Sequence, residues 1–154
     1  MARIIRLDII NGNPRSFVAP QELEQGLFLE IMGKAENLLG VEDFEAYEVE
    51  LASGSTERGQ LLLHASVANM YDERKIEAEF VLEEGKVGRG YQPVMGDIVT
   101  IPAIEGAVAG NKLALAGNGL LAVNETNAIA VVEAIEDITI PEAAPQKSMV
   151  IRFL

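Results

Sequence analysis

The fold is decided by the stretch Gly96-Asp97-Ile98-Val99-Thr100-Ile101, a glycine that is followed by alternating apolar residues. The same pattern recurs at Gly26-Leu27-Phe28-Leu29-Glu30-Ile31 and at Gly110-Asn111-Lys112-Leu113-Ala114-Leu115. Glycine adopts backbone conformations that other residues resist, and alternation with a period of two places one face of a strand on a core. Each copy therefore predicts a turn that leads into a strand.

Further short strands are predicted between these copies. Alternating or continuous apolar runs occur at 44–51, 60–67, 76–82, 128–135 and 149–154. Glycine-containing turns at 83–86 and 117–119 separate some of them, and helical periodicity is almost absent. We therefore expect a mainly β protein, a compact sandwich-like or barrel-like (β-tulip-like) domain with little helix.

The bulk composition limits the classes of function. The chain has 154 residues, 49% of them apolar, and a formal net charge of −12 with a pI near 4.5. A single domain with its own core is expected at this length. The acidic balance argues against nucleic acid and against an anionic membrane surface as partners. The absence of cysteine excludes disulfides and thiolate chemistry, and no secretion signal or membrane-spanning run is recognised.

The N-terminal residues allow two interpretations. Residues 1–17 are rich in apolar residues and end near prolines, so they form either an extended arm that reaches another subunit or an ordinary first strand. In the first case the single β-rich domain comprises residues 18–154.

No catalytic set accompanies these strands. His64, the only histidine, has Ser66 two residues further along but no placed acid, so we interpret it as a hydrogen-bonded core or interface histidine. The polar cluster 71–75 lacks the ligand spacing of a calcium loop, and it is better suited to a subunit contact through Tyr71 and Arg74. Residues 85–90 lack the Walker order and predict a flexible basic loop, in which Arg89 contacts an acidic neighbour. We expect no cofactor, no metal and no enzymatic activity.

Several of these phrases together resemble structural proteins from the heads of tailed bacteriophages. The resemblance begins near Leu61 and is carried by 61–66, 71–75, 85–91 and 96–98. The later part, from Gly96-Asp97 through 107–110 to 129–137, is similar to head-decoration or cement proteins, which share a Gly-Asp-hydrophobic strand and a late strand that ends in Glu-Asp.

The resemblance implies a virion protein that is made in the host cytoplasm and binds the major capsid protein at the capsid surface, as a homo-oligomer such as a trimer. A decoration, cement or minor capsid role is implied, and an arm would add a strand to the capsid protein. The anchors of such an arm would be Ile4, Ile5, Leu7, Ile9 and Phe17, with Arg15 facing acidic partners. The alternatives are a small β-barrel module that binds a ligand or peptide and, with least support, a hydrolase that uses His64.

Overall fold

The computed structural model describes residues 5–34, 46–66, 81–138 and 145–154, and within them the protein is mainly β. One sheet is antiparallel, and its six strands lie in the order β1 (Arg6–Ile9), β9 (Ile98–Pro102), β13 (Gln146–Phe153), β12 (Ala130–Ile138), β10 (Lys112–Gly117) and β11 (Leu120–Val123). A closed barrel contains β2 (Pro14–Val18), β5 (Ala46–Leu51), β4 (Phe28–Lys34), β6 (Leu61–His64) and β8 (Val87–Tyr91). Strands β3 (Leu23–Glu24) and β7 (Val81–Leu82) form a small third sheet, and a 3₁₀ turn spans Arg58–Gln60. The predicted fold class is confirmed.

The glycine phrases of the sequence are turns that lead into strands, as expected. Gly26, Gly96 and Gly110 have φ angles of 80°, 91° and 92°, in the left-handed region that only glycine adopts readily. Strands β4, β9 and β10 each begin two residues after their glycine. The N–H group of each glycine donates a hydrogen bond to a backbone carbonyl oxygen: Gly26 to that of His64, Gly96 to that of Phe153 and Gly110 to that of Val132. Each turn is thus joined to a neighbouring strand.

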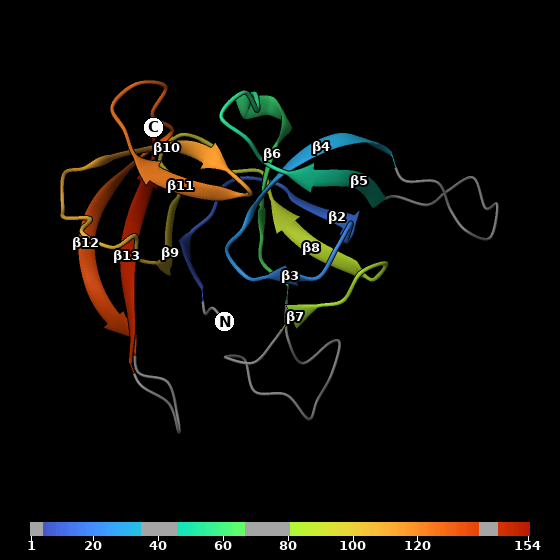
Figure 1. Ribbon diagram of the computed structural model, residues 1–154, viewed down its shortest axis with the longest axis horizontal. Coiled ribbons are helices and arrows are strands. Elements are labelled where there is room, and N and C mark those ends of the chain that lie inside the picture. The colour runs from blue at the N-terminus through green and yellow to red at the C-terminus, as the bar shows by residue number, and fades with distance from the viewer. Residues whose placement is uncertain (1–4, 35–45, 67–80, 139–144) are drawn as a thin grey trace.

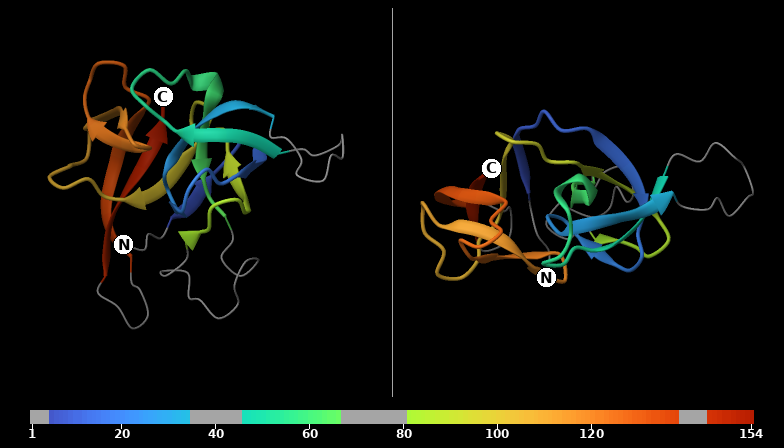
Figure 2. Two further views of the ribbon diagram at one scale, coloured as in Figure 1. Left: turned by 45° about the vertical axis from the view of Figure 1, so that its right-hand side comes forward. Right: turned by 90° about the horizontal axis from the view of Figure 1, so that it is seen from above.

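Two apolar cores lie on opposite sides of strand β6. The six-stranded sheet and the barrel stand side by side (Figures 1 and 2). Leu61 and Leu63 belong to the core between sheet and barrel, whereas Leu62 belongs to the core inside the barrel. All four residues of β6 are buried, which explains why this run is continuously apolar rather than alternating.

The glycine-rich segment is a barrel strand, and the prediction of a flexible basic loop at 85–90 is wrong. Gly85 (φ 81°) forms a turn, and strand β8 begins two residues later. A Cβ atom on Gly88 would lie 2.4 Å from Leu82 Cδ2, and one on Gly90 would lie 2.6 Å from Leu62 Cγ. These glycines are required because the barrel interior has no space for a side chain.

The N-terminal residues contribute one strand to the six-stranded sheet and one to the barrel, so of the two interpretations it is strands within the fold that are found for residues 6–18. Strand β1 pairs with β9, and β2 pairs with β5 and β8 in the barrel. An extended arm over 1–17 is therefore wrong for the residues that the structure describes, because their backbone is paired within this chain. Residues 1–4 lie outside the described residues.

The chain passes from the sheet to the barrel between β1 and β2 and returns between β8 and β9, and Asp97 joins these two connections. Its side chain is fully buried. Oδ1 accepts the Asn11 N–H at 2.8 Å, and Oδ2 accepts the N–H groups of Gly12 at 3.2 Å and Val94 at 3.0 Å. The carboxylate thus fixes how the sheet meets the barrel.

Candidate functional site

The structure separates the residues that we expected to bind a partner. Phe17 is 0% exposed inside the barrel, so its expected role as an anchor is wrong. Ile5 and Leu7 are partly buried and pack against the core between sheet and barrel. Ile9 is 51% exposed at the edge strand β1. Arg89 is exposed on β8.

Three of the expected contact residues lie outside the described residues: Ile4, Tyr71 and Arg74. Their expected contacts stay predictions.

His64 and Ser66 form a hydrogen-bonded pair inside the barrel. His64 Nδ1 lies 2.7 Å from the Glu24 carbonyl oxygen, and Nε2 lies 2.8 Å from Ser66 Oγ. Since a carbonyl oxygen only accepts, we assign the ring proton to Nδ1, so that Nε2 accepts the Ser66 hydroxyl proton. The Arg89 N–H in turn donates to Ser66 Oγ at 3.1 Å. Gln25 completes the cluster with two hydrogen bonds to the Ser66 backbone.

The surroundings keep this histidine neutral. Its side chain is 0% exposed, and the Phe17 ring meets it edge-on with ring centroids 5.4 Å apart. Burial lowers the pKa of His64 to about 4, and the hydrogen bond to the Glu24 carbonyl opposes this shift only in part. Desolvation disfavours the imidazolium form. The ring is therefore a neutral hydrogen-bonding group at physiological pH.

The distance between His64 Nε2 and Ser66 Oγ is one at which a base can activate a serine nucleophile. The two side chains are enclosed in the barrel, however, where a substrate has no room beside them. A catalytic serine needs room for a carbonyl group beside its Oγ atom. Ser66 is only 6% exposed, and its Oγ atom already has two hydrogen-bond partners. These hydrogen bonds satisfy buried polar groups at one end of the barrel, which agrees with the interpretation of His64 as a hydrogen-bonded core histidine.

No metal site is formed by the described residues, among which no three His, Asp or Glu side chains are grouped to hold an ion. The described part of the chain also holds no helix with the length and apolarity needed to cross a membrane.

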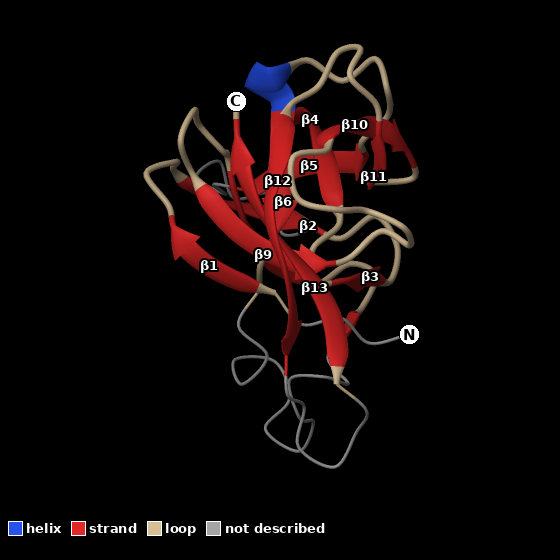
Figure 3. Cartoon of the chain, turned by 90° about the vertical axis from the view of Figure 1, so that its left-hand side faces the viewer, coloured by secondary structure: helices blue, strands red, loops and turns tan. Residues whose placement is uncertain are grey.

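Apolar side chains are exposed on several surface elements. Two belong to the edge strand β11, Leu120 (44%) and Val123 (47%), and Met95 (80%) lies in the turn before β9. Strands β1 and β11 are the outermost strands of the six-stranded sheet (Figure 3). An outermost strand presents backbone N–H and C=O groups to which another chain can add a strand.

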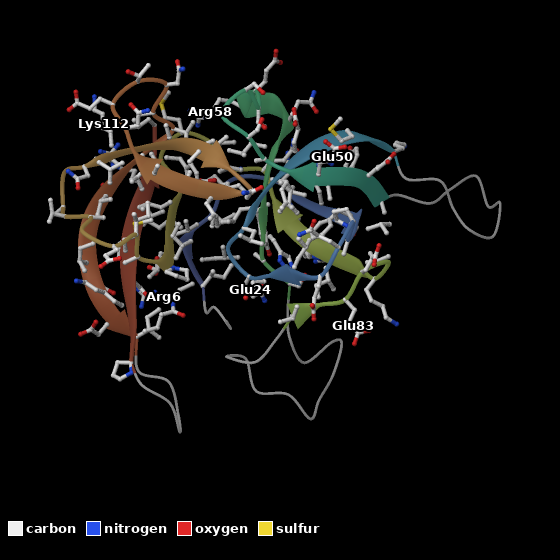
Figure 4. The ribbon with its side chains drawn as sticks, in the orientation of Figure 1. Arg6, Glu24, Glu50, Arg58, Glu83 and Lys112 are labelled. Atoms are coloured by element: carbon white, nitrogen blue, oxygen red, sulfur yellow. The ribbon has the colours of Figure 1, made fainter. Side chains whose placement is uncertain are left out.

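The described strands hold both a like-charge pair and opposite-charge pairs. On strands β4 and β5, Glu30 is directly opposite Glu50, a like-charge pair that is unfavourable by itself. On the sheet, Arg6 pairs with Asp8 at 2.6 Å and with Glu136 at 3.0 Å. Figure 4 labels Glu50 at the barrel and Arg6 beside the six-stranded sheet.

A basic cavity lies where β2, β4 and β5 come together. Its volume is about 320 Å³, and it is lined by Pro14, Arg15, Ser16, Lys34, Ala46 and Tyr47. Sequence reasoning named Arg15 but missed Lys34 and Tyr47. The sequence gives no local sign that Arg15, Lys34 and Tyr47 lie together. They meet because β4 pairs Lys34 with Tyr47 of β5, and β2 pairs Phe17, two residues after Arg15, with the same Tyr47.

A second, larger cavity of about 710 Å³ lies between the 54–58 loop and the sheet. Thr56, Glu57 and Arg58 line it from one side, and Asn124 and Asn127 line it from the other. Asn127 has a φ of 56°, which costs a non-glycine residue energy. The lining is mixed in polarity and nearly balanced in charge, so it selects no ligand class.

Comparison with known proteins adds no relative: no protein-family model, no curated protein and no solved structure matches this chain.

Proposed function

We propose that this protein is a structural component of a tailed-bacteriophage head, a decoration, cement or minor capsid protein that binds the major capsid protein lattice. Its site of action is then the capsid surface of the virion. The observation that carries the proposal is the contrast between the enclosed His64–Ser66 pair and the apolar side chains exposed on strand β11 and in the turns. Exposed apolar side chains on an edge strand suit contact with another protein, which can add a strand there.

The resemblance to phage head proteins, which covers the chain from about Leu61 onward, supports the same function. A protein that binds only the expanded shell stabilises that shell by mass action, without any chemical step. Because residues 6–18 are paired within the fold, we place strand addition at the exposed edge strands rather than at an N-terminal arm. Self-association into a homo-oligomer, such as a trimer, would present several such edges to the lattice at once.

A small ligand- or peptide-binding module is the second candidate, and the cavity beside the 54–58 loop favours it. Its volume of about 710 Å³ falls in the range of sites for small ligands. Its neutral, mixed lining does not single out a substrate class, so we rank it second.

Cosedimentation with expanded heads of the protein's own phage tests the proposal. We expect saturable retention on heads that lack this protein and little retention on unexpanded shells. Replacing Leu120 on the edge strand with Lys should weaken retention about tenfold, the size expected for loss of a central interface contact. The matched control is Val87→Lys, an exposed apolar residue of the barrel strand β8. Wild-type protein that stays in the supernatant while the heads pellet would contradict the function.

A further inference from the structure

The basic cavity at the barrel is built by strand pairing. Phe17 and Tyr47 are register partners in the parallel pair β2–β5, and Lys34 and Tyr47 are partners in the antiparallel pair β4–β5. Arg15 lies two residues before Phe17 and therefore on the same face of β2. Three side chains from three strands thus line one cavity, with the Tyr47 ring packed against the barrel core. Strand-borne groups are held more rigidly than groups on loops.

The described lining of this cavity has a charge opposite to that of the chain. The protein carries a net charge of −12, yet among the described residues that line the cavity both charged ones are basic. Arg6 and Arg152 form ion pairs with carboxylates of the sheet, whereas Arg15 and Lys34 pair with no carboxylate of the described residues. Arg15 Nε instead donates to Gln92 Oε1 at 2.9 Å. This bond holds the guanidinium in place, and within the described part of the chain no residue bonds its two terminal nitrogens, which a ligand could therefore use.

We propose that this cavity binds a carboxylate, namely an Asp or Glu side chain that the major capsid protein presents; this partner rests on the function proposed above. The two terminal nitrogens of Arg15 match the two oxygens of a carboxylate, and the Lys34 ammonium adds a second positive charge. The excess of acidic residues on this chain repels a doubly charged phosphate more strongly than a singly charged carboxylate. A carboxylate is therefore the anion that this cavity favours.

Two variants and a control test the site on phage heads. Lys34→Gln and Arg15→Gln should each weaken retention on expanded heads by about tenfold, the loss expected for one charge-assisted hydrogen bond. Lys112→Gln removes an exposed positive charge from the sheet strand β10 and should leave retention unchanged. Wild-type retention should fall as salt is raised, and it should fall less steeply for the two variants. If wild type is retained and both variants match it, the site is refuted while the proposed function stands.

A second measurement examines the cavity without the capsid. In the full-length protein, acetate added at constant ionic strength should shift the backbone amide resonances of Arg15 and Lys34, and Lys34→Gln should reduce the shifts. Larger shifts with phosphate than with acetate would refute the carboxylate assignment, and no shift with either anion would refute the site. Because this titration uses no heads, it tests the cavity even if the capsid function fails.

Discussion

His64 allows the sharpest quantitative prediction, since its protonation differs between the folded and unfolded chain. Burial lowers its pKa to about 4, against an ordinary value of 6.5. Between these pH values the unfolded chain takes up a proton that the folded chain does not, so the free energy of unfolding falls as the pH drops through this window. Each pH unit is worth about 1.4 kcal/mol, so the full loss is about 3 kcal/mol and is reached near the folded pKa.

Urea unfolding at a series of pH values measures this contribution. Carboxylates also titrate in acid, so we compare wild type with His64→Gln, in which an amide can still donate to the Glu24 carbonyl and accept from Ser66. The stability difference between the two proteins should be constant above about pH 7. Below that it should shift against wild type by up to about 1.4 kcal/mol per pH unit. A constant difference down to about pH 4 would refute the reasoning.

A direct titration avoids any dependence on the variant. His64 is the only histidine, so its ring resonances are unambiguous in an NMR spectrum. In the folded protein they should remain constant as the pH falls from about 8 to about 5, because the ring stays neutral. A midpoint near 6.5 in the folded protein would show that the ring is exposed to water and that the barrel end is not closed.

Three further substitutions test the fold by urea unfolding. Asp97→Ala removes the acceptor of one buried N–H group, that of Gly12, and of two partly buried ones, those of Asn11 and Val94. An unsatisfied buried donor costs about 1–3 kcal/mol and the other two cost less because water reaches them, so we expect a loss of about 2–4 kcal/mol. A loss below about 1 kcal/mol would mean that another group replaces the carboxylate. Gly90→Ala places a methyl group 2.6 Å from Leu62 Cγ and should cost about 1–3 kcal/mol; an unchanged midpoint would contradict the tight barrel interior. Glu50→Lys turns the like-charge pair with Glu30 into an opposite-charge pair and should stabilise by about 0.2–1 kcal/mol at low salt; a less stable variant would argue against this register.

The local features of the fold were predictable from the sequence because they depend on neighbouring residues. Gly96 and the alternating run after it suffice to predict the turn before β9, and the structure gives this glycine a positive φ. In the same way, the alternation of Tyr47, Val49 and Leu51 predicts β5. His64 is buried and hydrogen-bonded, which confirms its interpretation as a core histidine. It lies on β6, the strand that the short apolar run at 60–67 predicted.

What the sequence could not show depends on residues that are distant along the chain. In the sequence Gly88 looks like part of a flexible loop. Only the fold shows that the side chains of Phe17 and Leu82 lie so close to it that no side chain would fit there. In the sequence Asp97 looks like an ordinary turn residue. Two of the N–H groups from which its carboxylate accepts hydrogen bonds lie about 85 residues away along the chain, so nothing near it indicates this role. The basic cavity combines three strands whose pairing leaves no local signature, so Lys34 could not be selected.

The central claim, that this protein acts by adhering to a capsid lattice, is tested most directly by a density difference map of expanded heads with and without the protein. We predict regular additional density at lattice positions on the capsid surface, in contact with the major capsid protein through the edge strand β11 and the basic cavity. A featureless difference map from intact, expanded heads incubated with excess protein would contradict it.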